Sequence, residues 1–349
     1  MGMKNLVYFE HWTDSVAEKI LKASPDINLI RLRFGDSDQI NRRQIAAAHG
    51  LHLLPALELH DKWYPTKALI NECKKLLAIS VTGAGYDIID VPACTETGIL
   101  VVNNAGANST SVAQHVLGMM LALSKNMVQL DRLCRTTPNI DRRDHIGREL
   151  TGKTVGIIGL GNVGSKIAGL AQQGFDMQVI AYDPYISDSY CIEMGVRRVD
   201  FISLFRKADF VSVNCPLTNE TKGMIDLQMF KLMKSDAFFI TTARGGIHNE
   251  DALEEVLSQM RIAGAGLDVF NEEPPGPGHP LMKFNNVLMT PHVAGVTDVC
   301  NRNMAEIAAL QWVDIMRGHR PPRLINPEVW PAYQKRYFGI TGNEIADQT

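Results

Sequence analysis

The chain has 349 residues, of which 45% are hydrophobic and 21% are charged, and its formal net charge is −3. At roughly 150 residues per domain, this length accommodates about two domains of an ordinary globular protein. The 38 acidic residues outnumber the 35 basic ones, so the basic face that nucleic-acid binding requires is not expected.

The sequence also shows no targeting segment and no cysteine spacing typical of disulfides or zinc sites. The first residues, MGMKNLVYFEHW, lack the long apolar run of a signal peptide. The most apolar later stretch, residues 111–123, is too short for a membrane span and is interrupted by Gln114 and His115. The six cysteines include no CxxC pair, so neither a disulfide framework nor a zinc site is predicted. We therefore expect a reduced cytoplasmic protein with no membrane partner and no metal.

The first third of the chain alternates short apolar runs with helical stretches. Strands are predicted over residues 6–9, 27–31, 51–54, 77–80 and 99–102, with helices over 15–22, 42–49 and 66–74. Such alternation is typical of a parallel sheet covered by helices. One long helix is predicted next, over residues 111–133, followed by a polar, arginine-rich stretch that ends near Gly152.

The second half repeats this rhythm. Apolar strands are predicted over residues 154–158, 178–182, 210–214, 237–242, 265–269 and 287–290, with helices such as 163–173 and 250–259. Six strands make a complete dinucleotide-binding fold. A further helix, over residues 298–316, lies past the sixth strand. Its return to the first domain would make that domain discontinuous.

The sharpest local motif is a glycine-rich loop, VGIIGLGNVG, at residues 155–164. A GxGxxG pattern alone is weak, but here an apolar strand leads into it and an amphipathic helix leaves it. Gly159 would permit the tight turn, Gly161 the approach of a pyrophosphate, and Gly164 the packing of helix on strand. The amides near Asn162 and Val163 would then face the phosphates.

An acidic residue ends the next strand, as a ribose-binding site requires. Asp183 follows Val-Ile-Ala-Tyr, about 20 residues beyond the last glycine. A carboxylate there accepts hydrogen bonds from the ribose hydroxyls and repels a 2′-phosphate, which favours NAD over NADP. The alternative is that Asp183 merely caps the turn before Pro184.

Three later segments place reactive side chains at strand ends. They are TTARGG with Arg244, AGLDVFNEEP with Asp268 and Glu273, and TPHVAG with His292. In an open parallel sheet the ligand crevice lies beyond these carboxyl ends. Each residue alone also has an ordinary structural explanation: a surface arginine, solvated acids and a packing histidine.

Taken together, these residues match the needs of alcohol oxidation and its reverse. His292 would remove the hydroxyl proton or return it to the alkoxide. Glu273 would fix the imidazole tautomer and stabilise its protonated form. Arg244 would polarise the carbonyl and hold the acid group, and Asp268 would bind the nicotinamide carboxamide.

At these residues the sequence resembles the D-isomer-specific 2-hydroxyacid dehydrogenase family. The matching motifs occur in the family's order and include VTGAGYDIID (81–90), GILVVNNAGANSTSVAQH (98–115), GKTVGIIGLGNVG (152–164), CPLTNETKGMI (215–225), TTARGG (241–246), AGLDVFNEEP (265–274) and TPHVAG (290–295). The resemblance extends over more than half of the chain.

The resemblance implies an α/β protein with two doubly wound parallel-sheet domains. A Rossmann NAD-binding domain, residues 108–296, would be inserted in a flavodoxin-like substrate domain formed by residues 1–107 and 297–330. Residues 331–349 would be a C-terminal tail, and no regulatory domain is expected after residue 330. The resemblance also implies a homodimer, with the helix 111–133 at the interface and hinge.

The family's functional residues transfer to matching positions in this chain. They are Arg244, Glu273 and His292 for catalysis; Gly83, Ala84 and Gly85, with Arg244, for the substrate carboxylate; and Gly159, Gly161, Asn162, Val163, Gly164, Asp183, Thr242, Ala243, Asp268 and Gly295 for the cofactor. The implied activity is hydride transfer between NAD(H) and C2 of a small D-2-hydroxy or 2-oxo acid.

Three positions depart from the family's pattern. Thr241 stands where Asn is common, Gln114 where Glu is frequent, and Asn214 where His is frequent. They flank the site or line the adenine pocket, so they bear on cofactor geometry more than on reaction type.

Two other functions remain open at this point. Formate dehydrogenase resembles this family but pairs its histidine with Gln, and Glu273 argues against it. An NAD-sensing scaffold resembling the C-terminal-binding corepressors would use the fold without turnover. The complete Arg–Glu–His set argues for an enzyme.

Overall fold

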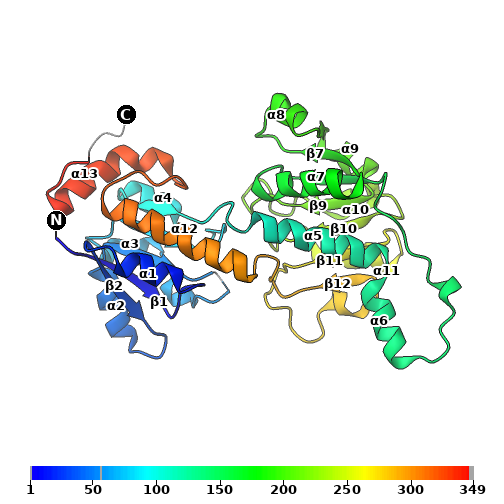
Figure 1. Cartoon of the computed structure of the whole chain (residues 1–349), viewed down its shortest axis with the longest axis horizontal. Coiled ribbons are helices and arrows are strands. Elements are labelled where there is room, and N and C mark those ends of the chain that lie inside the picture. The colour runs from blue at the N-terminus through cyan, green and yellow to red at the C-terminus, as the bar shows by residue number, and fades with distance from the viewer. Residues whose placement is uncertain (1, 56, 346–349) are drawn as a thin grey trace. The chain divides into compact units, whose positions relative to one another are not determined.

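The structure is a computed structural model that describes residues 2–55 and 57–345 (Figure 1). The chain folds as two compact units, each with its own core. Unit 1 comprises Met1–Asn108 and Thr297–Thr349, and unit 2 comprises Ser109–Val296. Each unit is built on one sheet of parallel strands.

Unit 1 contains a five-stranded sheet in the order β2-β1-β3-β4-β5. Its strands are β1 (Lys4–Phe9), β2 (Ile27–Leu32), β3 (Gly50–Leu53), β4 (Ala78–Val81) and β5 (Leu100–Val102). Its helices are α1 (Val16–Lys22), α2 (Asp38–Ala46), α3 (Lys67–Glu72), α4 (Val91–Glu96), α12 (Asp298–Met316) and α13 (Trp330–Thr341). This strand order is that of flavodoxin-like folds, so the predicted fold class is confirmed for this unit.

Alternation along β1 explains how both faces of this sheet are covered. Val7 and Phe9 pack in one cluster with residues of α2, α3 and α4. Leu6 and Tyr8 point the other way and pack with α1, α12 and α13, since successive strand side chains face opposite sides. Trp312 of α12 is fully buried in this second cluster. The C-terminal segment of the chain therefore completes the core of unit 1.

The expected C-terminal tail, residues 331–349, is helical as far as Thr341, because α13 extends over Trp330–Thr341. Tyr333 and Tyr337 are one helical turn apart and are almost fully buried, so this helix has an apolar face that must be covered. On another face, the Arg336 guanidinium donates to the backbone oxygens of Cys73, Lys74, Leu76 and Thr97. These contacts fix α13 to the body of unit 1.

Unit 2 contains a seven-stranded sheet in the order β12-β11-β10-β9-β6-β7-β8. Its strands are β6 (Thr154–Ile158), β7 (Gln178–Tyr182), β8 (Arg197–Arg198), β9 (Phe210–Val213), β10 (Phe238–Thr241), β11 (Gly264–Leu267) and β12 (Val287–Met289). Its helices are α5 (Ser109–Ser124), α6 (Met127–Thr136), α7 (Asn162–Phe175), α8 (Asp188–Glu193), α9 (Phe201–Lys207), α10 (Leu227–Leu232) and α11 (Glu250–Ser258). The order is that of a Rossmann fold with one added edge strand.

The sequence predicted six strands, and the structure adds β8. This strand consists of Arg197 and Arg198, both exposed. Two exposed charged residues carry no apolar pattern, so periodicity could not reveal a strand at this edge.

The predicted single helix over residues 111–133 is also wrong. The structure divides it into α5 and α6, and Asn126 between them adopts φ 53°. A left-handed residue cannot continue a right-handed helix, and Asn is among the residues that tolerate this conformation. α5 packs against α7, β10 and β11, whereas α6 buries none of its residues.

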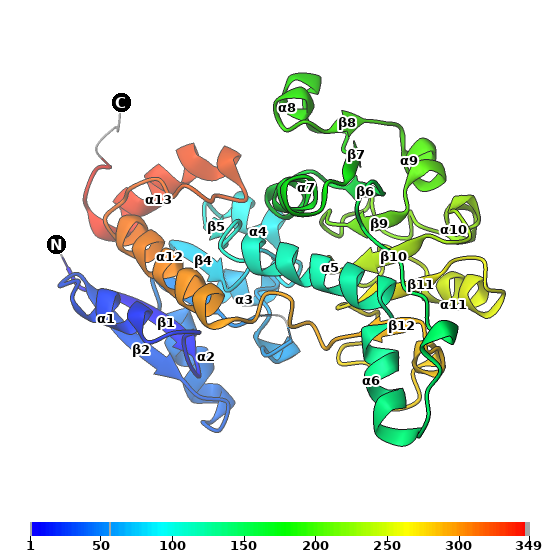
Figure 2. The same cartoon turned by 45° about the vertical axis from the view of Figure 1, so that its right-hand side comes forward.

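Helices cover both faces of the unit 2 sheet. α9, α10 and α11 share one face (Figure 2), where Phe205, Phe230 and Val256 are buried. α5 and α7 share the other, where Met120 and Ile167 are buried. All strands are parallel, so the loops that follow β6, β7, β10, β11 and β12 emerge at the same edge.

Candidate functional site

The histidine after β12 is paired with the glutamate after β11. His292 Nδ1 lies 2.7 Å from Glu273 Oε2, and their side chains are 28% and 14% exposed. The backbone N–H of Phe270 donates to Glu273 Oε1 at 2.8 Å, so each carboxylate oxygen has its own partner. With Nδ1 bound to the carboxylate, Nε2 is the imidazole atom left for chemistry.

Asp268, at the end of β11, holds the turn that carries His292. Its side chain has no exposed surface. Its Oδ1 accepts from Thr290 Oγ1 at 2.6 Å and from Val293 N at 2.8 Å, and its Oδ2 accepts from Ala294 N at 2.9 Å. A contact between Asp268 and a nicotinamide stays a prediction; in this structure the carboxylate organises the 290–294 turn.

Arg244 lies in the loop that follows β10, and β10 is the strand next to β11. Its Nη1 donates to the backbone oxygen of Ala243 at 2.8 Å. This loop packs closely on the loop that leads to Glu273, because a Cβ on Gly245 would lie 2.0 Å from Phe270 O. The fold of unit 2 therefore brings the strand-end loops of Arg244, Glu273 and His292 to one edge.

The glycine-rich loop has the geometry expected of a phosphate site. Gly159 adopts φ 90°, a conformation that only glycine enters readily, and a Cβ on Gly164 would lie 2.1 Å from Gly159 O. At Gly161 a Cβ would meet no atom within 4 Å, so this position faces open space. Gly161 also caps α7 without a side-chain hydrogen bond, which leaves the first helix amides for a ligand.

Asp183, after β7, caps a turn and also contacts the glycine-rich loop. Its Oδ1 accepts from Tyr185 N at 2.9 Å and caps the turn around Pro184, while its Oδ2 accepts from Leu160 N at 2.9 Å. The second bond ties it to the glycine-rich loop. The side chain is half-buried, and each carboxylate oxygen has further acceptor capacity for a ribose hydroxyl.

Two hydroxyls, one on the last residue of β10 and one on the next residue, have no hydrogen-bond partner in the part of the chain that the structure describes. Within the described residues, Thr241 Oγ1 and Thr242 Oγ1 are buried and accept or donate no hydrogen bond. A buried polar atom without a partner costs stability, and a bound cofactor would supply one. The open cradle at Gly161, the free helix start and these hydroxyls all fit a dinucleotide.

The remaining predicted site residues are exposed or half-buried, or make a hydrogen bond within their own segment. Gln114 is exposed on α5, and Asn214 uses its Nδ2 on Ser212 O at 3.1 Å. Asn214 therefore supports its own strand end. Asn162, Val163, Ala243 and Gly295 are exposed or half-buried along the loops already described.

The predicted carboxylate-binding loop, residues 83–85, lies after β4 in unit 1. Gly83 adopts φ 91°, and its N–H donates to Asn104 Oδ1 at 3.1 Å. Asn103 Nδ2 donates to Ala84 O at 2.7 Å. Because the Gly83 amide is engaged within the protein, the amides of Ala84 and Gly85 are the better candidates for an anion.

Sequence reasoning missed three residues that support this site. Ser111 and His115 of α5 bond to Ala294 O and Thr290 Oγ1, at 2.7 and 3.0 Å, and Thr290 links His115 to Asp268. His115 lies in the SVAQH motif and Thr290 in TPHVAG, so both had been noticed only as family matches. A hydrogen bond between α5 and a turn about 175 residues away leaves no local signal in a sequence.

Other kinds of site were also sought. No group of three or more His, Cys, Asp or Glu side chains that could hold a metal occurs among the described residues. The six cysteines, all in the described part, are free thiols. No helix over residues 2–55 or 57–345 is long and apolar enough to cross a membrane.

Comparison with known proteins identifies a family that this chain matches. Residues 117–294 match the model of the "D-isomer specific 2-hydroxyacid dehydrogenase, NAD binding domain" family. The chain is 38% identical over 265 residues to a D-3-phosphoglycerate dehydrogenase of Archaeoglobus fulgidus, covering 76% of this chain and 50% of that protein. It is 37% identical over 268 residues to a glyoxylate reductase of Thermofilum pendens, covering 75% and 78%.

Solved structures with the same fold include an Aquifex aeolicus D-lactate dehydrogenase complexed with NAD and lactic acid. Its TM-score is 0.78 at 25% identity, and the match covers 91% of this chain and 98% of that one. A D-mandelate dehydrogenase of Rhodotorula graminis shares the fold with a TM-score of 0.83 at 24% identity, covering 92% and 97%.

The chain belongs to the D-isomer-specific 2-hydroxyacid dehydrogenase family. Within that family, unit 2 is the NAD-binding domain, and NAD(H) is its cofactor. The chain spans about half the length of the phosphoglycerate dehydrogenases it matches and more than three quarters of the Thermofilum glyoxylate reductase.

Proposed function

We propose that this protein is an NAD-dependent oxidoreductase that interconverts a small 2-oxo acid and the D-2-hydroxy acid. The observation that carries the proposal is the 2.7 Å contact between His292 Nδ1 and Glu273 Oε2 at the ligand-binding edge of unit 2. A histidine paired with a carboxylate is the group that proton transfer at a carbonyl oxygen requires.

The proton moves through His292. NADH, when bound, supplies the hydride that reduces C2 of the oxo acid. Protonated His292 donates from Nε2 to the carbonyl oxygen as it gains negative charge, and the neutral imidazole takes a proton from water afterwards. Glu273 stabilises the protonated ring and holds its orientation. In the oxidation direction, neutral His292 accepts the hydroxyl proton.

The substrate carboxylate and carbonyl are assigned to cationic and amide donors. Arg244 offers a planar fork of N–H groups that suits an oxo acid and attracts its negative charge. Ala84 and Gly85 of unit 1 offer backbone amides, and glycine allows close approach of the anion. Each contact orients the substrate without taking part in proton transfer.

The cofactor assignment follows the loops after β6, β7 and β10. Gly161 with the amides of Asn162 and Val163 would bind the pyrophosphate. Asp183 would bind the adenosine ribose, and Thr242 would use its unpaired hydroxyl.

A single assay distinguishes this activity from the two alternatives. NADH consumption is followed with a panel of 2-oxo acids that includes glyoxylate, hydroxypyruvate, phosphohydroxypyruvate and bulkier members, and NAD reduction is followed with formate. We expect turnover of at least one 2-oxo acid and none with formate. Turnover of formate alone would identify a formate dehydrogenase. Tight NADH binding with no turnover on the whole panel would identify an NAD-sensing scaffold.

We also propose that the protein acts in the cytoplasm as a homodimer, with α6 at the interface. α5 uses its apolar side chains in the core of unit 2, so it has no apolar face left for a partner. α6 buries no residue and exposes 51% of Met127 and 39% of Val128. Such an apolar surface on a helix supports association.

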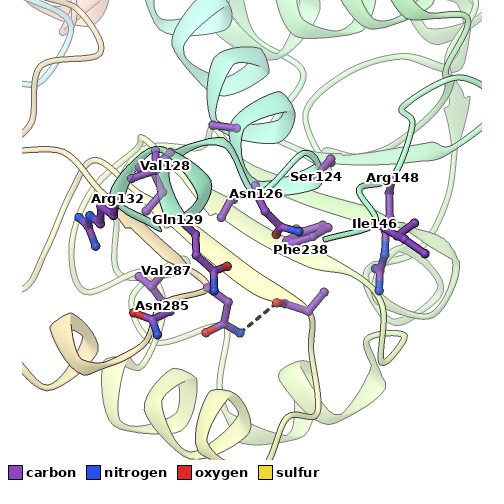
Figure 3. Close-up of a pocket in the computed structure, with 15 residues that line it drawn as sticks. Ser124, Asn126, Val128, Gln129, Arg132, Ile146, Arg148, Phe238, Asn285 and Val287 are labelled. Carbon is purple, nitrogen blue, oxygen red and sulfur yellow. Dashed lines mark hydrogen bonds between the residues drawn. The ribbon is translucent and has the colours of Figure 1, made fainter. Parts of the chain in front are cut away.

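A pocket beside α6 adds to this surface. It has a volume of about 210 Å³ and is lined by Val128, Ile146, Phe238 and Val287 among other residues. Figure 3 shows these side chains around the hollow, with Arg132 and Arg148 at its borders. Phe238 and Val287 begin β10 and β12, so the pocket lies at the sheet edge opposite to the catalytic residues.

The oligomeric state in solution tests this assignment. Sedimentation equilibrium should give a dimer for the wild-type chain and a monomer-rich distribution for Val128→Asp. Ile192→Asp, at a site 78% exposed on α8, is the matched control and should remain dimeric. A wild-type monomer, or a Val128→Asp dimer as tight as the control, would contradict the assignment.

A further inference from the structure

The catalytic histidine has an unusual backbone that needs support. His292 adopts φ 55°, a left-handed conformation that costs free energy in a residue other than glycine and persists only where the surroundings enforce it. The enforcing contacts are on its C-terminal side, where the N–H groups of Val293 and Ala294 donate to Asp268. The position of the imidazole therefore depends on the position of the Asp268 carboxylate.

Thr290 connects that carboxylate to α5. Its Oγ1 lies 2.6 Å from Asp268 Oδ1 and 3.0 Å from His115 Nε2. Thr290 Oγ1 donates its single hydroxyl proton to Asp268 Oδ1. Thr290 Oγ1 must then accept from His115, and His115 Nε2 carries a proton.

His115 is also the histidine that faces the buried charge. Its Nε2 lies 3.8 Å from Asp268 Oδ1, with the His115 side chain 23% exposed and that of Asp268 0% exposed. A buried carboxylate needs hydrogen bonds or a nearby cation to offset its lost hydration. Hydrogen bonding through Thr290 provides this support in either charge state of the imidazole.

A second contact from the same helix face holds the end of the turn. Ser111 lies four residues before His115, so both side chains project from one side of α5. Ser111 Oγ donates to Ala294 O at 2.7 Å. α5 is itself anchored by packing on α7, β10 and β11, so it is a rigid reference for this turn.

We propose that His115 and Thr290 are positioning residues that act through Asp268 to hold His292 in its catalytic geometry. The proposal rests on the proposed oxidoreductase activity, because it assigns these two residues to that reaction. Neither residue is assigned a contact with the substrate or a share in its proton transfer. Each acts on the backbone turn that carries the acid–base residue.

The hydrogen bonds that connect His115, Thr290 and Asp268 form what we call the relay. Matched substitutions distinguish the effect of this relay from that of simple packing. Thr290→Val keeps the shape of the side chain but removes the hydroxyl, whereas Thr290→Ser keeps the hydroxyl. His115→Leu removes the N–H donor, whereas His115→Gln retains one. Thr151→Val, on an exposed residue of the turn before β6, is a control for the loss of a threonine hydroxyl.

The kinetic result expected is a loss of kcat with rescue by the conservative variants. Misplacing a catalytic group by about 1 Å costs up to about 100-fold in rate, so Thr290→Val and His115→Leu should each lower kcat about 10- to 100-fold. The KM for the oxo acid should change far less. Thr290→Ser, His115→Gln and Thr151→Val should stay near the wild-type rate.

A double-mutant cycle separates a relay from two independent effects. If His115 acts through Thr290, the His115→Leu/Thr290→Val double variant should lose little more than the worse single variant. Additive losses, or single variants with wild-type kcat, would overturn the proposal. So would an equal loss in Thr290→Ser and Thr290→Val.

Amide hydrogen exchange gives a readout that does not need turnover. The Val293 and Ala294 amides should exchange faster in Thr290→Val than in Thr290→Ser, because their acceptor is less well fixed. Unchanged exchange would overturn the relay even if the enzyme is active. Faster exchange in a chain that reduces no 2-oxo acid would leave the relay standing as a structural device and refute the proposed function instead.

Discussion

At the scale of single residues, the proposed reaction gives Glu273 a role only through its contact with His292. Its Oε1 is held by the Phe270 amide and its Oε2 by the imidazole, so the carboxylate cannot turn away without breaking a hydrogen bond. This arrangement makes the charge of Glu273 a direct influence on the protonated state of the ring.

Removing that charge should change the pH dependence of the reaction. In the proposed reaction, reduction of an oxo acid needs protonated His292, and the neutral amide of Glu273→Gln stabilises it less than a carboxylate does. We expect the alkaline limb of the kcat/KM profile for reduction to move to lower pH, and oxidation to extend to lower pH. Identical profiles for Glu273→Gln and the wild type would show that the pair does not govern proton transfer.

Asp183 has a structural bond and a predicted ligand bond, and two substitutions separate them. Asp183→Asn keeps an acceptor for Leu160 N but loses the charge that repels a 2′-phosphate. It should bind NADPH better relative to NADH. Asp183→Ala should also weaken NADH binding, by about 10- to 100-fold, because charge-assisted hydrogen bonds are lost. Titration of both nucleotides measures this, and an unchanged NADH preference in both variants would reject the ribose assignment.

At the scale of elements, the segment from β6 through α7 contains glycines with different roles. A Cβ at Gly164 would lie 2.1 Å from Gly159 O, whereas one at Gly161 would meet no atom within 4 Å. Gly164 is needed for folding, and Gly161 is assigned to the ligand.

Alanine substitutions should therefore give opposite patterns. Gly164→Ala should lower the free energy of unfolding by about 1–3 kcal/mol, as overpacking does. Gly161→Ala should unfold like the wild type but bind NADH more weakly. Gly169→Ala, inside the same helix with no atom within 4 Å of its Cβ, should bind NADH normally and gain about 0.5–1 kcal/mol. Denaturant unfolding and NADH titration check these outcomes; full NADH affinity in Gly161→Ala would reject the phosphate assignment.

The same scale shows how far the sequence predicted this structure. Strands with strong apolar patterns, such as β6, β7 and β9, were placed to within about a residue, as was α12. The break at Asn126 was missed because α5 and α6 both have helical sequences and their separation depends on one backbone angle. α13 was missed because its aromatic residues are explained only by their packing on the core of unit 1.

The candidate site was predictable where function depends on residue type and position along a strand. The structure brings His292 and Glu273 into contact, as the sequence had suggested. The support around them was not predictable, since Ser111, His115 and Thr290 meet only after folding. Packing of distant elements has no periodicity that a single sequence can show.

At the scale of the whole molecule, each unit buries a histidine that the proposed chemistry does not use. Burial lowers the pKa of His52 in unit 1 to about 3 and that of His248 in unit 2 to about 4. His52 is well bonded, since Trp312 Nε1 donates to its Nδ1 at 3.4 Å and Thr82 Oγ1 lies 3.1 Å from its Nε2. Both rings are neutral in the folded protein at neutral pH.

These histidines should make both units sensitive to acid. Each folded pKa lies below the unfolded value of about 6.5, so the unfolded chain binds more protons as the pH falls from about 6.5 toward the folded pKa, and stability is lost in that window. At pH 5 the loss is about 2 kcal/mol per histidine.

Thermal unfolding of variants can assign this loss. His248→Leu should flatten the dependence of the unfolding free energy on pH between 7 and 5, whereas His60→Gln, at an exposed site, should not. An equal slope in His248→Leu and the wild type would contradict the buried neutral imidazole.

The central claim is that unit 2 of this family member holds an acid–base histidine serving hydride transfer to C2. The most direct measurement compares wild-type protein and His292→Ala for NADH binding and for NADH oxidation by the best 2-oxo acid of the panel. We expect His292→Ala to bind NADH with nearly wild-type affinity while its kcat falls by about 100- to 10,000-fold, the contribution typical of general acid–base catalysis. A His292→Ala variant that reduces the oxo acid at the wild-type rate would contradict the account.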